Sequence, residues 1–260
     1  MNRHAIVTGA SSGIGKEFAR ILGREGFDLT VIARTESRLQ ILANEIQSSH
    51  PGCKVTVRPC DLSNDLQREQ LIKDLDLDNN SYDLLVNNAG FGHYGPLRET
   101  DWSRLHEMIN LNIVSLTHLT HAFCGSLQKK HKTHILNVAS TAAFQAGPLM
   151  AVYYATKAYV LSLGVALSSE LKHDNIVVST LCPGPTETEF VNHSGVDKSK
   201  LLQHMRFADP RQVAEFGYRA LKKEKTIAIP GVMNKILAQS NRMISRSLAA
   251  NLAKKFQEPI

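Results

Sequence analysis

The amino-acid sequence predicts an α/β protein built on one doubly wound parallel sheet of about seven strands, with helices on both faces. Short runs rich in Val, Ile and Leu alternate with longer helical stretches along the chain. With 260 residues, of which 43% are hydrophobic and 21% charged, the chain can bury the core of one large domain. No internal repeat, linker or low-complexity tract divides it, so a single domain is expected.

The predicted strands are separated by segments that are long enough for a helix. They occupy residues 5–9, 28–34, 54–61, 82–90, 134–140, 176–184 and, more weakly, 226–231. The clearest helices are predicted at 13–25, 36–49 and 102–129. Units of this kind form parallel sheets with right-handed crossovers. The predicted domain covers residues 1–230, includes an irregular, lid-like loop at about 184–209, and is followed by an extension at 231–260.

The first predicted strand runs into a glycine-rich turn, TGASSGIGKE at residues 8–17, that opens the first predicted helix, where backbone N–H groups can bind a phosphate. The mononucleotide P-loop pattern does not fit, because Ala10 stands at its first glycine and Glu17 at its Ser/Thr position. The spacing fits a dinucleotide loop, in which three glycines serve the sharp turn, the pyrophosphate approach and the helix–strand packing. A tight turn built from small packing residues is the alternative interpretation. The residues predicted to contact a dinucleotide here are Gly9, Ser11, Ser12, Gly13, Ile14 and Gly15.

The end of the second predicted strand indicates which dinucleotide is bound. NAD-binding units place an acidic residue there for the ribose hydroxyls, whereas a 2′-phosphate requires that acid to be absent and a cation to be near. Ala33 stands at the expected acidic position and Arg34 follows it. Because a guanidinium matches a phosphate bidentately, the sequence predicts NADP(H), with Arg34 as the discriminating residue and Arg38 as a weaker helper. The alternative is a solvated arginine that opens an amphipathic helix.

The charge of the chain does not indicate a nucleic-acid partner. The formal net charge is +6 and the pI is near 9.1, but Lys and Arg are scattered among acidic residues. The two basic runs, at 129–132 and 222–225, each follow a predicted helix, where cations interact favourably with the helix dipole and face water. No nucleic-acid binding is therefore expected.

The four cysteines do not indicate a metal site or a disulfide framework. Cys53, Cys60, Cys124 and Cys182 show neither a CxxC pair nor His/Cys ligand spacing. No metal is therefore expected, and the setting is predicted to be reducing and cytoplasmic. The first predicted strand begins near His4, which leaves no room for an export signal ahead of it.

Five motifs follow one another along the chain. They are TGxxxGxG at residues 8–15, NNAG at 87–90, Ser140 thirteen residues before Tyr153, YxxxK at 153–157 and PGPTET at 183–188. With these motifs in this order, the chain resembles the classical short-chain dehydrogenase/reductase family from Arg3 to about Pro230. The resemblance implies a Rossmann-type fold, a nicotinamide cofactor and reversible hydride transfer between a carbonyl and an alcohol.

Tyr153 and Lys157 are four residues apart on a predicted helix, so their side chains share one face. A phenol with a pKa of about 10 needs a neighbouring cation to act as an acid–base catalyst at neutral pH, and the Lys157 ammonium can supply it. The resemblance implies that Tyr153 donates the proton to the carbonyl oxygen and that Ser140 hydrogen-bonds this oxygen. It also implies that Lys157 lowers the pKa of Tyr153 and holds the nicotinamide ribose. Tyr154 is rotated by about 100° on the helix and is expected to point away from the site.

The resemblance also implies an asparagine that anchors a water relay behind Lys157. Asn112 is the expected residue, and the nearby Asn110 is the alternative. Further cofactor contacts are implied after the third, fourth and sixth predicted strands, for the adenine ring, the adenosine ribose and the nicotinamide end. They are Asp61, Asn88, Ala89, Gly90, Pro183, Gly184, Thr186 and Thr188, of which Asp61 has a helix cap as its alternative role.

Apolar side chains near the catalytic strand ends and in the variable loop predict a pocket for a lipophilic ketone or aldehyde, such as a ketoacyl chain or a steroid. They are Phe91, Phe144, Leu149, Phe190, Met205 and Phe207, any of which can equally belong to the core. His93 is interpreted as a loop residue without a catalytic role. A non-catalytic module that senses NADP(H) is the alternative function, but Ser140, Tyr153 and Lys157 are all present.

The extension at 231–260 carries apolar side chains at roughly helical spacing. The cations between them are Lys235, Arg242, Arg246, Lys254 and Lys255. Packing over the cleft or on a subunit partner is favoured, because amphipathic helices usually face a core, and the alternative is an anionic membrane surface. The segment 153–171 is apolar nearly all round, which predicts burial on more than one side. The resemblance implies a homodimer or homotetramer.

Overall fold

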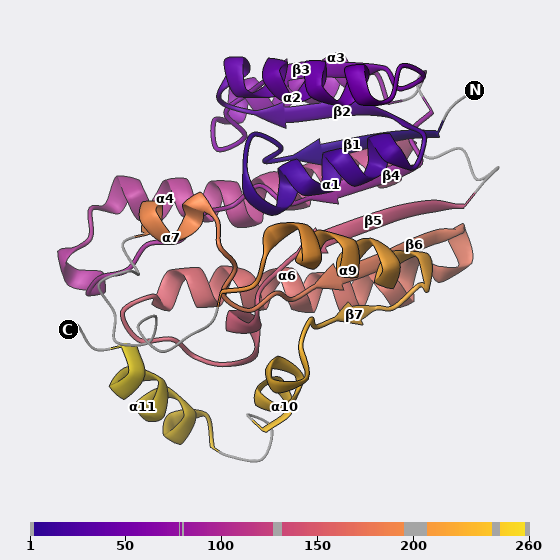
Figure 1. Ribbon diagram of the computed structural model, residues 1–260. Coiled ribbons are helices and arrows are strands. Elements are labelled where there is room, and N and C mark those ends of the chain that lie inside the picture. Colours follow the sequence, from indigo (N-terminus) through magenta and orange to yellow (C-terminus); the bar gives the residue numbers. More distant parts are fainter. Residues whose placement is uncertain are drawn as a thin grey trace.

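The computed structural model describes residues 3–77, 79, 81–126, 132–194, 207–240 and 245–257. At its centre lies one parallel sheet of seven strands in the order β3-β2-β1-β4-β5-β6-β7, with helices on both faces (Figure 1). The predicted doubly wound α/β fold is therefore confirmed. Met205 and residues 129–131 of the first basic run lie outside the described ranges.

All seven predicted strands form. They are β1 (Arg3–Thr8), β2 (Phe27–Ala33), β3 (Val55–Pro59), β4 (Leu84–Asn87), β5 (Thr133–Val138), β6 (Ile176–Leu181) and β7 (Ile227–Ala228). β1 pairs with β2 on one side and with β4 on the other, so that Ala5 lies beside both Leu29 and Leu84. The strand order reverses at this point, and doubly wound sheets bind ligands in the crevice beyond the carboxyl ends of such strands.

Each face of the sheet has its own helices and its own hydrophobic core. One face is covered by α1 (Gly13–Arg24), α2 (Glu36–Ser49) and α9 (Pro210–Lys222), and the other by α3 (Asp65–Leu75), α5 (Leu116–Ser126) and α6 (Ala151–Glu170). Because side chains alternate along a strand, Ala5 and Val7 pack into the first core and Ile6 into the second. Two packed cores hold the carboxyl ends of β1, β4 and β5 in place.

The helix predicted at 102–129 is divided in the structure. α4 (Trp102–Ile109) is followed by a π-helical segment (Asn110–Ser115) and by α5, and residues 127–129 lie outside the described ranges. The hydroxyls of Ser115 and Thr117 donate hydrogen bonds to the carbonyls of Leu111 and Ile113 at 2.9 and 2.8 Å. A π-helical turn changes the direction in which the following side chains point and is frequent at functional sites.

The lid-like loop and the extension both contain helices. α7 (Glu189–Ser194) lies in the loop, of which residues 195–206 are outside the described ranges. The extension forms α10 (Val232–Ser240) and α11 (Arg246–Gln257), which stand outside the two helical layers at one end of the molecule (Figure 1). Within the ranges that the structure describes, no helix is both long enough and apolar enough to cross a membrane.

Candidate active site

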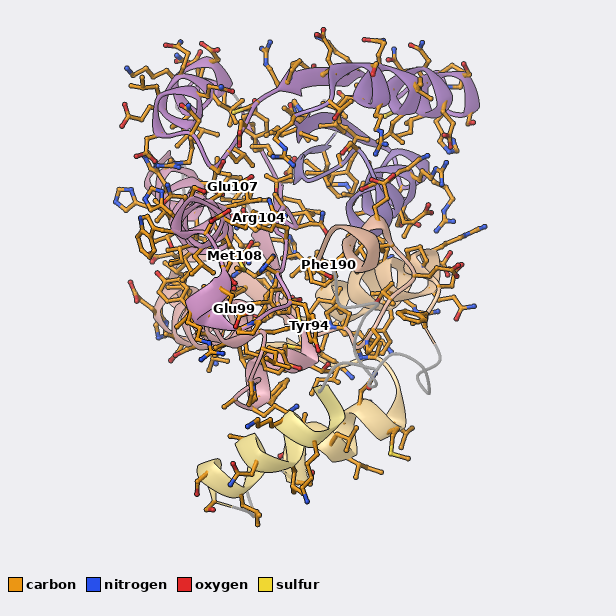
Figure 2. All side chains as sticks on the ribbon, turned by 90° about the vertical axis from the view of Figure 1, so that its left-hand side faces the viewer. Tyr94, Glu99, Arg104, Glu107, Met108 and Phe190 are labelled. Atoms are coloured by element: carbon orange, nitrogen blue, oxygen red, sulfur yellow. The ribbon has the colours of Figure 1, made fainter. Side chains whose placement is uncertain are left out.

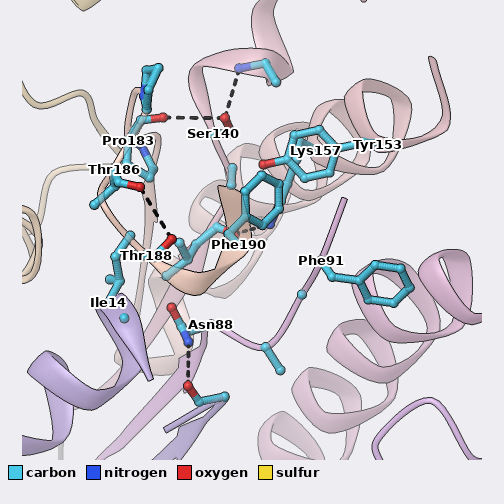
Figure 3. A pocket seen from close by; sticks show the side chains of 18 of the residues that line it. Ile14, Asn88, Phe91, Ser140, Tyr153, Lys157, Pro183, Thr186, Thr188 and Phe190 are labelled. Carbon is cyan, nitrogen blue, oxygen red and sulfur yellow. Dashed lines mark hydrogen bonds between the residues drawn. The ribbon is translucent and has the colours of Figure 1, made fainter. Parts of the chain in front are cut away.

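A cavity of about 740 Å³ lies beyond the carboxyl ends of the central strands (Figure 3). Its wall is formed by the glycine turn, the segments after β2, β3, β4, β5 and β6, the start of α6, and α7, α10 and α11. All of the predicted site residues line this cavity except Gly15 and Asn112. These two lie directly behind the wall and hold it in shape.

Gly15 sits where the first helix packs against the glycine turn. A Cβ at this position would collide with the backbone oxygen of Gly9 and with the amide nitrogen of Asn88. The Asn88 side chain donates hydrogen bonds to the carbonyls of Thr8 and Gly9 at 3.0 and 3.2 Å. Asn88 therefore fixes the turn from the neighbouring strand, a role that the sequence did not predict because the two segments are about 80 residues apart.

The Thr8 hydroxyl joins the same two strand ends. It donates to the carbonyl of Val86 at 3.2 Å and accepts from the backbone N–H groups of Asn88 and Ala89, each at 3.0 Å. The glycine turn itself requires left-handed backbone, with φ of +64° at Gly9 and +54° at Gly13. Together these contacts place the turn and the segment after β4 side by side at the cavity.

Tyr153 and Lys157 lie one helical turn apart on α6, and both are buried. The ring of Phe190, from α7, packs on the Tyr153 ring with 5.2 Å between their centroids. A Cβ at Gly92 would lie 2.7 Å from the Phe190 ring and 3.1 Å from the Tyr153 ring, so glycine is needed for this contact. Figure 3 shows Ser140, Tyr153 and Lys157 near one another, with Asn88 and Ile14 farther along the pocket.

Burial shifts the pKa values of both residues. It raises the pKa of Tyr153, and a hydrogen bond with Ser140 opposes this rise without reversing it. Burial also lowers the pKa of Lys157 to about 8. The direction for Tyr153 is opposite to the lowered pKa expected from Lys157, whose Nζ donates to the Val138 carbonyl at 2.9 Å and lies 5.9 Å from the centre of the phenol ring.

Ser140 follows β5 and caps a short 3₁₀ helix. Its Oγ accepts a hydrogen bond from the backbone N–H of Ala142 at 3.1 Å and donates to the carbonyl of Pro183 at 3.4 Å. The second of these contacts ties the end of β5 to the turn after β6. Ser140 therefore joins the part of the cavity wall that follows β5 to the part that follows β6.

Asn112 lies in the π-helical segment and is almost fully buried. Its amide group donates to the carbonyl of Phe91 at 2.9 Å and to the Thr156 hydroxyl at 3.0 Å, and its oxygen accepts from the Phe91 N–H at 3.1 Å. A Cβ at Gly90 would lie 2.9 Å from this oxygen and 3.5 Å from the Lys157 Nζ. Of the two candidate asparagines, Asn112 is thus the one beside Lys157, whereas Asn110 donates to the carbonyl of Ser63 at 3.5 Å.

Arg34 and Arg38 line the cavity beyond the end of β2, and each forms an ion pair with a carboxylate from another element. Arg34 Nη1 lies 3.1 Å from Glu107 Oε1 on α4, and Arg38 Nη1 lies 2.7 Å from Glu189 Oε2 on α7. Glu107 also accepts from Arg104 at 3.0 Å (Figure 2). Sequence reasoning missed both acidic partners, because nothing in the local pattern joins them to β2.

Asp61 follows β3, and its carboxylate accepts hydrogen bonds within its own loop. Its Oδ1 accepts from the backbone N–H and the hydroxyl of Ser63 at 3.0 and 2.6 Å. The cap of α3 is Asn64, which accepts from Gln67 N–H. Asp61 is therefore not the cap of this helix, and its contact with an adenine ring stays a prediction.

The apolar part of the cavity differs in part from the prediction. Phe91, Phe190 and Phe207 line it. Phe144 is partly buried and packs against a core cluster that includes Leu116, and Leu149 is not among the lining residues. Met150 and Tyr154 line it in addition.

Tyr154 was predicted to point away from the site, and this prediction is wrong. The cavity extends around the start of α6 and so reaches the next side chain on the helix. Gly147 lets the Tyr154 ring approach closely, because a Cβ there would lie 2.5 Å from its carbons. The Tyr153 and Tyr154 rings meet edge to face with 6.1 Å between their centroids.

His93 lies outside this cavity. His93 borders a separate polar hollow beside Arg104, and burial together with this guanidinium lowers its pKa. Among the described residues, no group of three or more His, Cys, Asp and Glu side chains is placed so that it could hold a metal ion.

Related sequences agree with this architecture. A family model described as short chain dehydrogenase matches residues 3–199. The very-long-chain 3-oxoacyl-CoA reductase of Neurospora crassa is 34% identical over 181 residues, which are 67% of this chain and 53% of that protein. An uncharacterized oxidoreductase of Staphylococcus aureus is 27% identical over 226 residues, which are 86% of this chain and 93% of the relative.

Solved structures are similar over nearly the whole chain. A short-chain dehydrogenase from Sphingobium yanoikuyae in complex with NADPH superposes with a TM-score of 0.83 at 26% identity, covering 96% of this chain and 99% of the other. A bulky-bulky ketone specific alcohol dehydrogenase from Comamonas testosteroni has a TM-score of 0.78 at 26% identity, covering 96% and 98%. The chain spans about half the length of the fungal reductases, 53% and 56% of those from Neurospora crassa and Mycosarcoma maydis. Because the family model covers most of the chain and a solved short-chain dehydrogenase superposes on nearly all of it, this protein belongs to the short-chain dehydrogenase family of oxidoreductases.

Proposed function

We propose that this protein is an NADP(H)-dependent oxidoreductase that interconverts a carbonyl and an alcohol by reversible hydride transfer. The observation that carries the proposal is the convergence of Ser140, Tyr153 and Lys157 on the same cavity that the glycine turn lines. Residues 1–230 form the proposed catalytic domain, and the extension at 231–260 closes one side of the cavity through α10 and α11.

The residues at the cavity fit a phosphorylated dinucleotide. A Cβ at Gly9 or Gly13 would meet Ala89 or Thr188 at 2.9 Å, so only glycine lets the backbone of the turn form this wall. Ala33 ends β2 and stands where an NAD site has its acid, and Arg34 follows it directly. When bound, the nicotinamide cofactor supplies or accepts the hydride. The NADPH in the Sphingobium yanoikuyae structure supports the same choice here.

Each end of the dinucleotide has a proposed set of contacts. The glycine turn would hold the pyrophosphate, Arg34 the 2′-phosphate, Asp61 the adenine, and the segment 88–90 the adenosine ribose. Tyr153 and Lys157 would hold the nicotinamide ribose, and the turn after β6 would hold the nicotinamide end through Pro183, Gly184, Thr186 and Thr188.

Tyr153 is the proposed proton donor during reduction. Its raised pKa keeps the phenol protonated at neutral pH, which is the form required to protonate a carbonyl oxygen. The Ser140 hydroxyl, which opposes the rise in the pKa of Tyr153, would bond the same oxygen and align it with the phenol. As the proton leaves, the nearby Lys157 ammonium stabilises the resulting phenolate, and Asn112 anchors the path by which the proton is replaced.

The proposed substrate is a lipophilic ketone or aldehyde. Phe91, Met150, Tyr154 and Phe190 give the catalytic end of the cavity an apolar wall, to which Leu237 and Leu252 contribute from the extension. Apolar walls with a few converging polar groups are typical of sites for hydrophobic ligands. Relatives described as reductases of very-long-chain 3-oxoacyl-CoA and as a bulky-bulky ketone specific dehydrogenase support this class.

A homodimer or homotetramer is proposed as the assembly. Val114, Tyr159 and Val165 leave apolar side chains exposed along the π-helical segment and α6, which a subunit contact would cover. Sedimentation velocity of the purified chain tests this, and a monomer at all concentrations would contradict it.

The proposed function is tested by following NADPH absorbance with ketoacyl esters, quinones, steroids and aldehydes. Turnover with at least one lipophilic carbonyl, and its loss in Tyr153→Phe, is the expected result. Tight NADPH binding combined with silence across this panel would contradict catalysis and favour the alternative, a non-catalytic NADP(H) sensor.

A further inference from the structure

The two helices of the extension present large apolar side chains to solvent. Of the large hydrophobic residues that are exposed in the described ranges, six lie on α10 and α11, which have nine and twelve residues. They are Val232, Met233, Ile236, Leu237, Leu248 and Leu252. Val232 and Met233 are the most exposed of these, at 73% and 66%. An exposed cluster of this kind marks an interaction surface.

The inward side of the same helices is built from small residues. Ala238 on α10 and Ala249 and Ala253 on α11 are buried, and all three line the cavity. The usual pattern of a core-facing amphipathic helix places the large apolar residues inside. Here the small residues face inward and most of the large ones face outward, so packing on the cleft accounts for only part of the pattern.

The extension carries an excess of positive charge. Residues 231–260 contain five Lys and Arg and one acidic residue, Glu258. Lys235, Lys254 and Lys255 are exposed on the same two helices as the apolar cluster. Figure 2 shows side chains of both helices projecting away from the rest of the molecule. Apolar residues interspersed with cations on short surface helices are typical of segments that lie in the interface of an anionic bilayer.

We propose that α10 and α11 form a docking surface for an anionic lipid membrane, with the exposed apolar side chains inserted among the lipids and the lysines at the headgroups. A second copy of this chain fits the surface less well. An isologous contact would bring the same cations of both copies together. Anionic headgroups complement these cations, and each Lys or Arg near such a surface contributes about 1 kcal/mol.

The docking surface continues to the mouth of the cavity. Leu237 and Leu252 line the cavity and are also exposed, at 50% and 44%. A lipophilic substrate dissolved in the bilayer would therefore meet the apolar wall without crossing water. This last step rests on the proposed function, whereas the docking surface itself does not.

Sedimentation of the full chain with vesicles tests the proposal. Wild type is compared on vesicles of phosphatidylcholine alone and of phosphatidylcholine with phosphatidylserine, at low and high ionic strength and without substrate. One variant combines Met233→Ser with Leu248→Ser, and a second combines Lys254→Glu with Lys255→Glu. The matched control is Leu66→Ser, which removes a side chain that is 78% exposed on α3, away from the extension. NADPH titration of each variant checks that it is folded.

Wild type and the Leu66 variant are expected to pellet with the anionic vesicles, and less at high ionic strength. The apolar variant should lose about tenfold or more in vesicle affinity, and the charge variant about tenfold or more. Wild type that stays in the supernatant at low ionic strength would overturn the proposal, as would an equal loss in the Leu66 variant. A change of oligomeric state in the apolar variant with unchanged vesicle binding would show a protein interface instead. An inactive protein that pellets as described would leave the docking surface standing and contradict only the proposed reaction.

Discussion

Replacing Arg34 with aspartate tests the choice of cofactor. Arg34 follows β2 at the cavity wall, and its guanidinium is held 3.1 Å from the Glu107 carboxylate. The substitution removes the cation that would bind a 2′-phosphate and places a carboxylate directly after Ala33, the position of the acid that binds ribose hydroxyls in NAD sites. The expected result is a shift of preference from NADPH toward NADH.

The size of the shift follows from the exposure of Arg34. A hydrogen bond to a charged group contributes about 1.5–3 kcal/mol. Because the Arg34 side chain is 62% exposed and shares its charge with Glu107, the lower end of that range applies, or about tenfold. The new carboxylate adds repulsion of about 1 kcal/mol at about 4 Å from the phosphate. The ratio of kcat/KM for NADPH to that for NADH should therefore fall by roughly 10²-fold.

The assay measures kcat/KM for both cofactors with one carbonyl substrate. Arg98→Asp is the matched control, since Arg98 is an exposed arginine with a carboxylate partner and does not line the cavity. Glu107→Gln should raise NADPH affinity a few-fold, because the competing ion pair contributes about 0–1 kcal/mol. An unchanged cofactor ratio in Arg34→Asp, or an equal change in Arg98→Asp, would refute the reasoning.

Two further substitutions and one pH dependence follow from the geometry of the site. Gly15→Ala should destabilise the fold by about 1–3 kcal/mol and abolish NADPH binding, because its Cβ would collide with the backbone of Gly9. Thermal melting measures the first effect and NADPH titration the second. The neutral control is Gly52→Ala, since a Cβ at Gly52 meets open space. Asn112→Ala should lower the stability by about 1–3 kcal/mol and also lower kcat, because it leaves the Phe91 backbone unpaired. Asn110→Ala should change stability and kcat little. Equal losses in the two variants would contradict the choice of Asn112 over Asn110. Burial lowers the pKa of Lys157 to about 8, so reductive kcat/KM should fall as the pH rises through that value. A kcat/KM that does not change across this pH range would contradict the role of the Lys157 ammonium. The unfolded chain keeps this proton up to 10.5, so the Lys157 contribution to the free energy of unfolding should increase between the two values.

Much of the fold could be predicted because its signals are local. Runs of Val, Ile and Leu mark each strand, and the parallel order follows from the helices between them. The carboxyl ends of these strands meet at one edge, so the glycine turn, Ser140 and the start of α6 had to converge there. The i, i+4 spacing of Tyr153 and Lys157 likewise needed only helix geometry.

The remaining features depend on contacts between distant segments. The pairs Arg34–Glu107 and Arg38–Glu189 join residues that are 73 and 151 positions apart. The Tyr154 prediction failed because helix rotation gives a direction but not the extent of the cavity around α6. The pKa of Tyr153 moved in the unexpected direction because desolvation depends on the packing of Phe190 and Tyr154, which the sequence does not show.

The central claim is that the Tyr153 hydroxyl delivers the proton, and the most direct test compares turnover and cofactor binding in Tyr153→Phe. The substitution keeps the ring that packs on Phe190 and removes only the hydroxyl. Reductive kcat is predicted to fall by about 10²–10⁴, with the dissociation constant for NADPH, measured by fluorescence titration, close to that of wild type. Turnover that survives the loss of this hydroxyl would contradict the account.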